Sequence, residues 1–557
     1  MPMTVRVDQD TIILSCKGAE FIRAQSILVS ALGRKCKVER GELKVPLVCA
    51  EVVIDKFPNI KCPEILSLKS ALAAHGTAVA NASVEFKNAQ TNRISSNWQN
   101  VLDIPQQYAV NAMVHPGLFG ACLFDEQGTG KTVMAIATFD TLVDADEVDR
   151  LVVVSPKSML GGWKKDVENF LKDKYTVGIV EGSLAQKRSV VDSCADILVI
   201  NYEGINNVLV LLKALGKKSR LMLVMDESYY AKNPGAVRSV HLQELRPYCA
   251  RGYVLCGTPA PRSPYDLINQ VNLADNGYAF SSFSKGPSED SDREIIKQLV
   301  AERAIVIRRL KQDVIKDVPG KEFKIIRVQL TEQQRSMYEK ARDELLVELK
   351  TLDNRLFRKW LTTYFQRRAT LLEICATPKM VDPLYIKPSA KLIKLKELVN
   401  ELVSKGRKTL IWTCYRTSVE EICSTLSEYN PQVIDGTISS GEERARIVSD
   451  FQTNPNCMVL VANPAAAGAG ITLHASHDAI YYSYTNQAAH YLQSLDRIHR
   501  RGQKARVVNY YMLICENTIE ENEVRRLRQR ELAQHDLLGD AVPWPESLDQ
   551  ALAELNQ

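Results

Sequence analysis

The chain has 557 residues, of which 45% are apolar and 25% are charged, and its formal net charge is +5. That length exceeds what one hydrophobic core supports and predicts several domains, while the composition excludes disordered and collagen-like classes. Because the sequence has no apolar run near the ~20 residues of a membrane span, and residues 1–20 lack the pattern of a signal peptide, we expect a cytoplasmic protein (nuclear if the host is a eukaryote) with no membrane partner.

The cysteines and the net charge narrow the classes of site and partner. Thirteen cysteines are scattered along the chain without a Cys-x-x-Cys pair. Zinc sites need clustered ligands, so we expect reduced cysteines that are buried as small apolar side chains. The modest positive charge permits a polyanionic partner without demanding one.

The first two segments in chain order differ in their apolar pattern. Residues 1–95 hold short apolar runs and no recognisable chemistry, which indicates a small accessory α+β domain. Over residues 96–275, apolar runs of the kind found in buried strands alternate with helix-like stretches. These runs cover residues 151–154, 197–200, 221–225 and 252–255. Continuous apolar runs followed by polar loop residues predict a parallel sheet that is covered on both faces.

The second half of the chain is helical at first and then repeats the strand pattern. Residues 276–390 are charged and helical in character, and they open with a polar stretch, 281–292, that we expect to be a loop or a tip. Alternation of strands and helices resumes over residues 391–535, before a tail at 536–557. The expected strands there cover residues 409–412, 458–461, 479–482 and 507–513. The predicted fold is α/β, with two parallel-sheet lobes, a helical insert between them and a small N-terminal domain.

Residues 125–132 form the most distinctive motif, Asp-Glu-Gln-Gly-Thr-Gly-Lys-Thr, after an apolar run that ends at Phe124. A glycine-rich turn lets backbone N–H groups converge on phosphate oxygens, and a helix that starts there adds a favourable dipole. We expect Lys131 to reach the β- and γ-phosphates and Thr132 to bind magnesium. Asp125 stands where the strict pattern has glycine, so the loop is a variant. The expected phosphate-binding residues are Gly128, Thr129, Gly130, Lys131 and Thr132.

Two adjacent acids, Asp226 and Glu227, follow the expected strand at 221–225. A carboxylate at the end of a buried strand is costly unless a cation or hydrogen bonds satisfy it. We expect Asp226 to bind magnesium and Glu227 to polarise the attacking water. The alternative is a strand that simply reaches solvent. The phosphate-type loop in the same lobe, in the right order, argues against that alternative.

Residues 493–503 read Gln-Ser-Leu-Asp-Arg-Ile-His-Arg-Arg-Gly-Gln. Arg497 and Arg500 are three positions apart, so on a helix they share a face. Such a pair suits arginine fingers that reach across a cleft to a γ-phosphate. The alternative, which spacing alone favours, is a basic patch that faces solvent or DNA.

Taken together, these motifs resemble helicase superfamily two, and within it the Snf/Swi branch. The matching segments are Gln107, 125–132, 155–158 with Trp163, 226–233, 255–259, 466–473 and 493–503. Residues 308–311, 319–321 and 373–378 resemble the helical insert of the same branch. The resemblance covers about residues 100–530, and the chain is similar to a small prokaryotic or phage-like member of this branch.

The resemblance implies a motor with two RecA-like lobes that uses ATP and Mg²⁺. It implies that Gln107 reads the adenine and that Gly470 and Gln493 belong to the nucleotide site. Catalytic roles are implied for Lys131, Asp226, Glu227, Arg497 and Arg500. Tyr229, Cys256 and Thr472 depart from residues that are common in the family.

A motor that tracks duplex DNA needs phosphate contacts from both lobes. In the first lobe the DNA-binding candidates, chosen by motif, are Lys157, Ser158, Lys232 and Asn233. In the second lobe they are Arg416, which follows the expected strand that ends at Trp412, and Thr472. Any one of them alone is more often a solvated surface residue. Residues 352–368 mix basic and aromatic side chains, but the aromatic ones recur at helical spacing, which favours core packing over base stacking. The residues of that helix face are Phe357, Trp360, Leu361, Tyr364 and Phe365.

The sequence therefore predicts a monomeric, DNA-stimulated ATP hydrolase that translocates on double-stranded DNA. Its work would be to remodel or displace protein–DNA complexes, or to rewind DNA. One alternative is a strand-separating or RNA-directed helicase, against which Lys232, Asn233 and the helical insert argue. Another is a nucleotide-gated DNA-binding subunit of a larger complex. Against this last alternative stand the intact residues Lys131, Glu227, Arg497 and Arg500.

Overall fold

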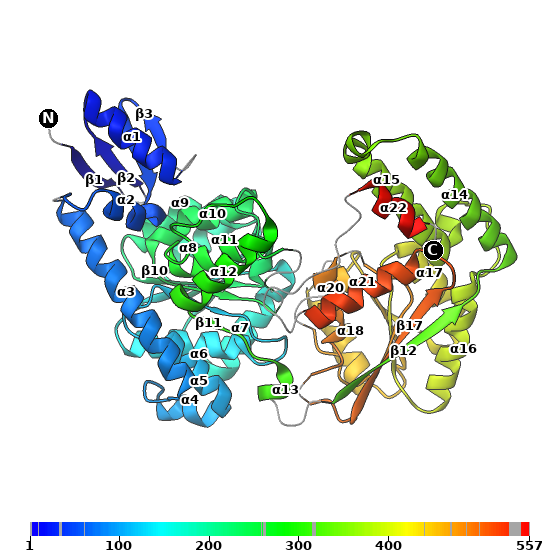
Figure 1. Ribbon diagram of the computed structural model, residues 1–557. Helices are drawn as coiled ribbons and strands as arrows, with labels where there is room; N and C mark the ends of the chain where they lie inside the picture. The colour runs from blue at the N-terminus through cyan, green and yellow to red at the C-terminus, as the bar shows by residue number, and fades with distance from the viewer. Residues whose placement is uncertain are drawn as a thin grey trace. The chain divides into compact units, whose positions relative to one another are not determined.

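The computed structural model describes residues 3–8, 11–32, 36–60, 62–257, 259, 263–314, 319–438, 441–467, 471–485, 487–500, 502–533 and 547–555. It divides into two compact units, Met1–Val314 and Ile315–Gln557 (Figure 1). Among the helices of these described ranges, none combines the length and the apolar character that crossing a lipid bilayer requires.

The first unit begins with a small antiparallel sheet of order β1-β2-β4-β3. Its strands are β1 (Thr4–Asp8), β2 (Thr11–Ser15), β3 (Lys37–Glu39) and β4 (Glu42–Pro46). Helices α1 (Ala19–Leu32) and α2 (Ala50–Lys56) cover it, and Leu14 and Leu43 share one core with Leu28 and Val53. This is the small α+β domain that the sequence predicted. The long helix α3 (Pro63–Lys87) leads from it to the larger sheet (Figure 1).

The larger sheet of the first unit has seven parallel strands in the order β11-β5-β10-β9-β6-β8-β7. They are β5 (Gly120–Leu123), β6 (Arg150–Ser155), β7 (Val177–Val180), β8 (Ile197–Asn201), β9 (Leu221–Asp226), β10 (Cys249–Leu255) and β11 (Val306–Ile307). Val153 and Val224 pack in one core with α5, α6 and α7, while Leu223 and Met225 are also fully buried. The sheet is therefore covered on both faces, and all four strands expected here are confirmed.

The helices of the first unit connect these strands in the manner of a parallel sheet. They are α4 (Ser96–Val101), α5 (Ile104–Met113), α6 (Lys131–Asp144), α7 (Leu160–Leu171), α8 (Leu184–Asp192), α9 (Ile205–Gly216), α10 (Val237–Leu245), α11 (Asp266–Asp275) and α12 (Glu289–Arg303). The loop expected at 281–292 is shorter than predicted. Ser288 caps α12 by accepting a hydrogen bond from the Ser291 N–H, and acidic residues in the first turn favour that end of a helix.

Residues 276–390, expected as one helical insert, are divided between the two units. Helix α12 and strand β11 belong to the first unit, which ends with the short helix α13 (Lys311–Val314). The second unit contains β12 (Gly320–Val328), α14 (Glu332–Lys350) and α15 (Asn354–Ala376). Strand β12 joins the second sheet because it pairs with β17 along all nine of its residues.

The second unit has a six-stranded parallel sheet in the order β12-β17-β16-β13-β15-β14. Its other strands are β13 (Thr409–Trp412), β14 (Gln432–Ile434), β15 (Val459–Ala462), β16 (Asp478–Tyr481) and β17 (Val507–Cys515), all four expected ones among them. Its further helices are α16 (Ala390–Ser404), α17 (Arg416–Thr425), α18 (Gly441–Thr453), α19 (Pro464–Ala467), α20 (Ala488–Leu495), α21 (Glu520–Ala533) and α22 (Leu548–Leu555). Two cores, one on each face, enclose this sheet.

Helices α14 and α15 pack as a pair and carry the predicted aromatic face. Phe357 and Tyr364 are fully buried, as expected, whereas Phe365 is 39% exposed, so for Phe365 the prediction of core packing is wrong. Part of the expected tail is the helix α22, which packs in the same core as α14 and α15. Its buried Glu554 accepts hydrogen bonds from Arg368 and Arg526, which fixes this helix to α15 and α21.

Candidate nucleotide-binding site

The glycine-rich loop leaves the carboxyl end of β5 and leads into α6, which begins at Lys131. Gly128 and Gly130 have φ angles of 83° and 89°, a backbone region that favours glycine. A Cβ atom at Gly130 would lie 2.3 Å from Gln106 Nε2, so a larger residue would displace this glutamine side chain in addition to straining the backbone. The loop thus has the backbone shape that its sequence predicted, with a helix start directly behind it.

Lys131 is buried, and its ammonium group rests on the loop. Its Nζ donates to the carbonyl oxygens of Asp125 at 2.9 Å and of Glu126 at 3.2 Å, and it lies 3.5 Å from Gln127 Oε1. Thr129 Oγ1 donates to the Glu126 carbonyl at 2.9 Å. These carbonyls are neutral acceptors, and a phosphate that replaced them would form stronger, charge-assisted hydrogen bonds to the same cation.

The two acids lie where β9 ends, and hydrogen bonds hold them in place. Trp163 Nε1 donates to Asp226 Oδ2 at 2.8 Å, and the Glu227 N–H donates to Asp226 Oδ1 at 2.9 Å. Glu227 adopts a left-handed backbone with φ 50° and ψ 51°, a costly conformation for a residue with a Cβ that is often found at functional sites. Burial raises the pKa of Asp226, opposed by the Trp163 hydrogen bond and the Lys131 charge.

Gln127 connects the loop to the acids. Its Nε2 donates to Glu227 Oε1 at 2.9 Å, while its Oε1 faces Lys131. Strand β10 lies between β5 and β9 in the sheet, and Gly257 follows it. This glycine makes room for the Gln127 side chain, because a Cβ atom there would lie 2.7 Å from Gln127 Cγ. The sequence analysis assigned Gln127 no role of its own, although it lies within the motif 125–132. Lys131, Glu227 and Asp226 are therefore brought into one cluster.

The donor set of this cluster fits a magnesium ion. Mg²⁺ prefers oxygen ligands and is usually held by one or two carboxylates together with substrate phosphates. Asp226 supplies a buried carboxylate, and Thr132 is the second residue of α6, half-buried beside Lys131. The assignment of Thr132 and Asp226 as metal ligands stays a prediction.

The two neighbouring glutamines at the start of α5 face different partners. Gln107 Nε2 donates to the carbonyls of Gln99 and Leu102, both at 2.9 Å, so its amide is engaged with the α4 segment. Gln106 Nε2 instead donates to the Thr129 carbonyl in the phosphate loop at 2.9 Å. The reading of adenine by Gln107 stays a prediction. Gln106, which the sequence did not indicate, is the glutamine that contacts the loop.

Residues 308–311, which follow β11, resembled part of the helical insert in the sequence, and their contact with the phosphate loop was not predicted. Arg309 forms an ion pair with Asp125, which is fully buried. Its neighbour Arg308 donates to the carbonyls of Phe124 and Gly257. The Lys311 N–H donates to Glu126 Oε2 at 2.8 Å. The variant Asp125 of the loop thus has a specific charge partner.

In the second unit, Arg497 and Arg500 converge on one carbonyl. Arg497 Nη1 and Arg500 Nη1 donate to the Ile471 oxygen at 3.0 and 3.1 Å, and Arg500 also donates to Thr472 Oγ1 at 2.6 Å. The prediction that they lie on a helix is wrong, because α20 ends at Leu495 and both follow it in turns. Their guanidinium groups nevertheless lie close together, because both donate to the Ile471 carbonyl. Gln493 is buried and accepts from Arg497 through its carbonyl, while Gly470 lies outside the described residues.

The DNA-binding candidates differ in their exposure and in the contacts that their side chains already make. Lys157 and Ser158, in the turn after β6, are exposed. Lys232 Nζ forms an ion pair with Asp266 at 2.9 Å, and Asn233 Oδ1 accepts from the Gly235 N–H. Arg416, at the start of α17, is 73% exposed beside Glu420, and Thr472 contacts Arg500 as described. All six assignments stay predictions.

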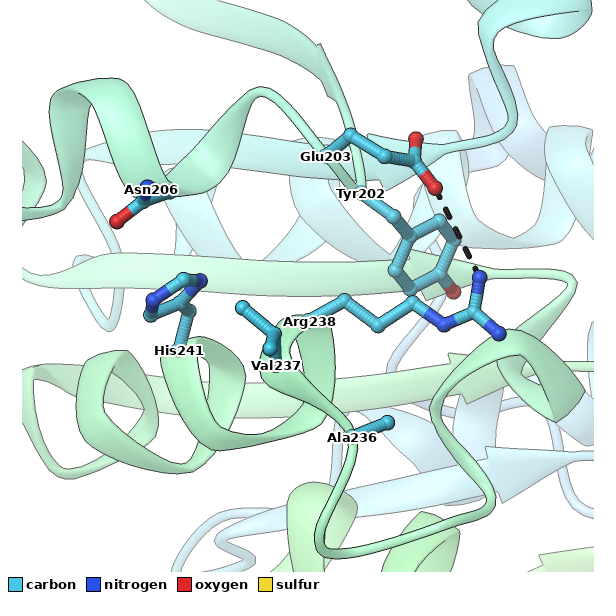
Figure 2. A pocket seen from close by; sticks show the side chains of 7 residues that line it. All are labelled: Tyr202, Glu203, Asn206, Ala236, Val237, Arg238 and His241. Atoms are coloured by element: carbon cyan, nitrogen blue, oxygen red, sulfur yellow. Dashed lines mark ion pairs between the residues drawn. The ribbon is translucent and has the colours of Figure 1, made fainter.

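A surface pocket of about 350 Å³ lies between the segment that runs from the end of β8 into α9 and the start of α10 (Figure 2). Its lining residues are Tyr202, Glu203, Asn206, Ala236, Val237, Arg238 and His241. The Tyr202 hydroxyl donates to the Asp226 carbonyl at 2.8 Å, and Arg238 lies 3.7 Å from Glu203. Tyr202 is therefore the lining residue that contacts the end of strand β9.

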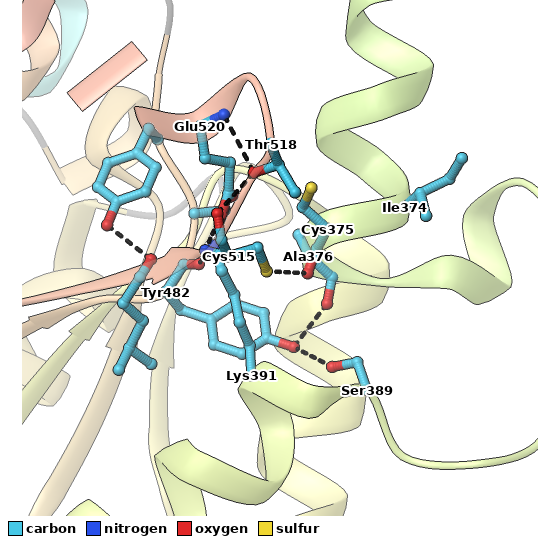
Figure 3. Close-up of polar contacts among 12 residues, drawn as sticks. Ile374, Cys375, Ala376, Ser389, Lys391, Tyr482, Cys515, Thr518 and Glu520 are labelled. Atoms are coloured by element: carbon cyan, nitrogen blue, oxygen red, sulfur yellow. Dashed lines mark hydrogen bonds and ion pairs between the residues drawn. The ribbon is translucent and has the colours of Figure 1, made fainter. Parts of the chain in front are cut away.

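A buried cluster in the second unit contains three potential metal ligands, Cys375, Cys515 and Glu520, whose ligand atoms lie within 4.8 Å of one another (Figure 3). Lys391, also fully buried, donates to the Glu520 carboxylate and to the Tyr482 carbonyl. Its ammonium already supplies the positive charge that a metal would bring, and burial raises the pKa of the Cys515 thiol. We interpret the cluster as a structural network. All thirteen cysteines are free, and most are buried, as expected.

Two family models match the segments of the chain that contain these motifs. Residues 105–380 match the family model described as the SNF2-related domain, and residues 390–502 match the helicase conserved C-terminal domain. An uncharacterized ATP-dependent helicase of Mycoplasma pneumoniae is 27% identical over 446 residues, which cover 77% of this chain and 41% of that protein. The DNA annealing helicase and endonuclease ZRANB3 of Homo sapiens is 24% identical over 484 residues, which cover 82% of this chain and 42% of that protein. The chain thus spans about two fifths of the length of these relatives.

A solved structure, the SWI2/SNF2 ATPase core of Sulfolobus solfataricus in complex with double-stranded DNA, is 23% identical. The match covers 78% of this chain and 93% of that one, with a TM-score of 0.36. A likeness at this score adds nothing to what the two family models establish.

Proposed function

Because this chain belongs to the SNF2-related family of ATP-dependent helicases, we propose that it is a motor that hydrolyses ATP to translocate along double-stranded DNA. The observation that carries the proposal is the cluster of buried Lys131, Asp226 and Glu227, joined by the half-buried Gln127, at the carboxyl edge of a parallel sheet. Ligands of open α/β sheets bind at this edge, and the cluster holds every group that phosphoryl transfer to water requires from one side of a nucleotide.

In this proposal each residue has a separate task. The loop backbone and Lys131 bind the β- and γ-phosphates and stabilise the charge that develops as the bond between the γ-phosphorus and the β–γ bridging oxygen breaks. Glu227 orients the attacking water and accepts its proton. Magnesium, when bound by Thr132 and Asp226, would neutralise charge on the phosphate oxygens. Arg497 and Arg500 would add positive charge at the γ-phosphate, and Gln107, Gly470 and Gln493 would complete the nucleotide site.

The DNA part of the proposal rests on the family and on exposed basic side chains. Phosphate contacts position a protein along a duplex without reading its sequence, which suits a motor. Lys157 and Arg416 are exposed cations in different units; Lys157 belongs to a segment that resembles a family motif, and Arg416 begins the helix that follows strand β13. We propose that these contacts let the chain displace bound proteins or rewind DNA, and that it acts as a monomer.

The test is to measure phosphate release from ATP with duplex DNA, single-stranded DNA, RNA or no nucleic acid. We expect the highest rate with duplex, and displacement of a third strand from a triplex on the same DNA, without strand separation on a forked duplex. A rate that is independent of nucleic acid would contradict the motor. Unwinding of the fork, or stimulation by RNA alone, would favour the strand-separating or RNA-directed alternative.

A further inference from the structure

We infer that Arg309 and Lys311 are positioning residues of the phosphate-binding loop. They hold the side chains of Asp125 and Glu126 in place, so that the carbonyl oxygens of the same two residues fix the Lys131 ammonium. The affinity of the loop for nucleotide phosphate would then depend on residues 308–311, which lie outside the loop in the sequence. The inference deepens the proposed function, on which it rests for the identity of the ligand.

The backbone of this segment runs beside the loop. Strand β11 is the parallel neighbour of β5, and the Phe124 N–H donates to the Ile307 carbonyl at 2.8 Å. The ladder continues one step beyond both strands, because the Glu126 N–H donates to the Arg309 carbonyl at 3.0 Å. Residues 308–311 therefore lie along the first residues of the loop, where their side chains can set its course.

The side chains complete this attachment. Arg309 Nε lies 3.1 Å from both carboxylate oxygens of Asp125, and Nη2 contacts the same group. The planar guanidinium matches a carboxylate in this two-pronged geometry, which a lysine ammonium cannot reproduce. Lys311, which is 2% exposed, donates through its N–H to Glu126 at 2.8 Å, with its Nζ 3.9 Å from the same carboxylate. Two consecutive loop residues are thus each held by a cationic residue of one segment.

Arg309 also reaches the other wall of the loop. It donates to the Pro105 carbonyl at the start of α5. The next residue of that helix, Gln106, accepts from the Asp103 N–H at 2.9 Å as part of a capping box and donates to the Thr129 carbonyl in the loop. Arg309 therefore joins the start of the loop, at Asp125, to the helix that contacts its far end.

The segment that contacts the loop lies at the end of the first unit. The first unit ends at Val314, directly after helix α13, which begins at Lys311. The phosphate loop is thus anchored on the last residues of this unit before the chain passes into the second. A change at this exit would alter the position of the Asp125 and Glu126 carbonyls, and through them the position of Lys131.

A purely structural ion pair elsewhere in the same sheet provides the control. Arg251 is 4% exposed, forms an ion pair with Glu147 and donates to the carbonyls of His115 and Leu118. It lies at the amino end of the sheet, since its neighbour Gly252 pairs with Gly120, the first residue of β5. Replacing either arginine by lysine keeps the charge and removes the fork, so both changes should weaken the fold similarly.

The experiment compares Arg309→Lys with Arg251→Lys in the full chain without DNA. Nucleotide affinity is measured by titration with a fluorescent ATP analogue in magnesium buffer, and the fold by the thermal midpoint. We expect both midpoints to fall, but nucleotide affinity to fall roughly tenfold in Arg309→Lys only. Equal affinity in Arg309→Lys and wild type, or an equal loss in both variants, would overturn the inference.

A double-mutant cycle keeps the test decisive if Arg309→Lys folds poorly. Asp125→Asn, Arg309→Gln and the combined variant replace the buried charges by neutral amides one at a time and together. We expect the combined loss of affinity to be smaller than the product of the single losses, since the second change removes a contact that is already broken. Losses that multiply would refute the linkage. If the wild-type chain bound no nucleotide at all, the proposed function itself would fail, and this inference with it.

Discussion

The cations of the two units are held in similar ways but have different surroundings. Lys131 rests on the carbonyl oxygens of Asp125 and Glu126, and Arg497 and Arg500 both rest on the carbonyl of Ile471. In each case a phosphate could replace a neutral acceptor with a gain in charge-assisted hydrogen bonding. In the first unit two carboxylates lie close to the cation, and Gln127 links Lys131 to Glu227.

This difference indicates a division of labour. In the proposed function, the first unit would supply the phosphate loop, the carboxylate for a metal and the acid that orients water, and so the groups that bind a nucleotide. The second unit would contribute arginines, which stabilise the extra negative charge of a transition state more than that of the ground state. Binding should therefore depend on the first unit, and turnover on both.

The largest expected effect is that of Lys131→Ala in the first unit. Loss of the ammonium removes charge stabilisation both in the bound nucleotide and in the transition state, so we expect kcat/KM for ATP to fall about 10⁴-fold, with weaker binding of the ATP analogue. Phosphate release with duplex DNA and the fluorescence titration measure the two effects. Lys218→Ala, at an exposed lysine of the same unit, is the control. A Lys131→Ala variant that bound nucleotide normally would break the division of labour.

Arg500→Ala should separate turnover from binding. We expect kcat to fall by roughly 10³-fold while affinity for the ATP analogue changes little, because an arginine finger acts on the transition state. Arg506→Ala is the matched control, since Arg506 is an exposed arginine of the same basic stretch. If the two variants behaved alike, the stretch would be a solvated basic patch, which was the alternative interpretation of its spacing.

The local structure around the candidate site that the sequence predicted correctly is the part with local signatures. Apolar runs placed the strands that end at Leu123 and Asp226, and glycines at 128 and 130 placed the loop, because these patterns reflect the conformation of a few consecutive residues. The expected helix around Arg497 and Arg500 was wrong because periodicity does not reveal where a helix stops. The end of α20 at Leu495 carries no glycine or proline to mark it.

The parts that could not be predicted depend on contacts between distant segments. Asp125 looked like a departure from the loop pattern, whereas its partner Arg309 lies 184 positions away and reaches it only because β11 pairs with β5. Gln106 and Gln107 differ by one position on α5, and only the orientation of that helix decides which of them meets the loop. Likewise, the helix at residues 548–555 is attached through ion pairs of Glu554 with Arg368 and Arg526, which are distant in the sequence.

A smaller effect is expected from Trp163→Phe, which sharpens the role of the first unit. Burial raises the pKa of Asp226, and the Trp163 hydrogen bond lowers it, so removing that bond raises the pKa further. The carboxyl group must be ionised to bind magnesium, and it is protonated as pH falls through its pKa. The acid limb of kcat/KM should therefore move to higher pH, with a loss of roughly tenfold at acid pH and little loss at alkaline pH.

The control for this pH profile is Trp98→Phe. Trp98 is also buried and donates through Nε1 to a carboxylate, that of Asp140, at the same distance of 2.8 Å. Asp140 lies on α6 and takes no part in the proposed chemistry, so the acid limb should stay where it is in wild type. An identical shift in both variants would mean that the profile reports on the fold and not on Asp226.

The smallest expected effects concern single DNA contacts, and they extend the comparison to the surfaces of the two units. Lys157→Ala and Arg416→Ala should each weaken duplex binding a few-fold and lower the slope of log affinity against log salt by about 1, because each removes one phosphate contact. Lys164 and Lys405 are the matched controls, since each is an exposed lysine with a glutamate four positions away on its helix. Arg416 likewise has Glu420 at that spacing, so the local ion pair cannot explain a difference. If the slope changed for Lys157 but not for Arg416, the duplex would bind through the first unit alone. A motor in which both lobes contact the phosphate backbone would then be contradicted.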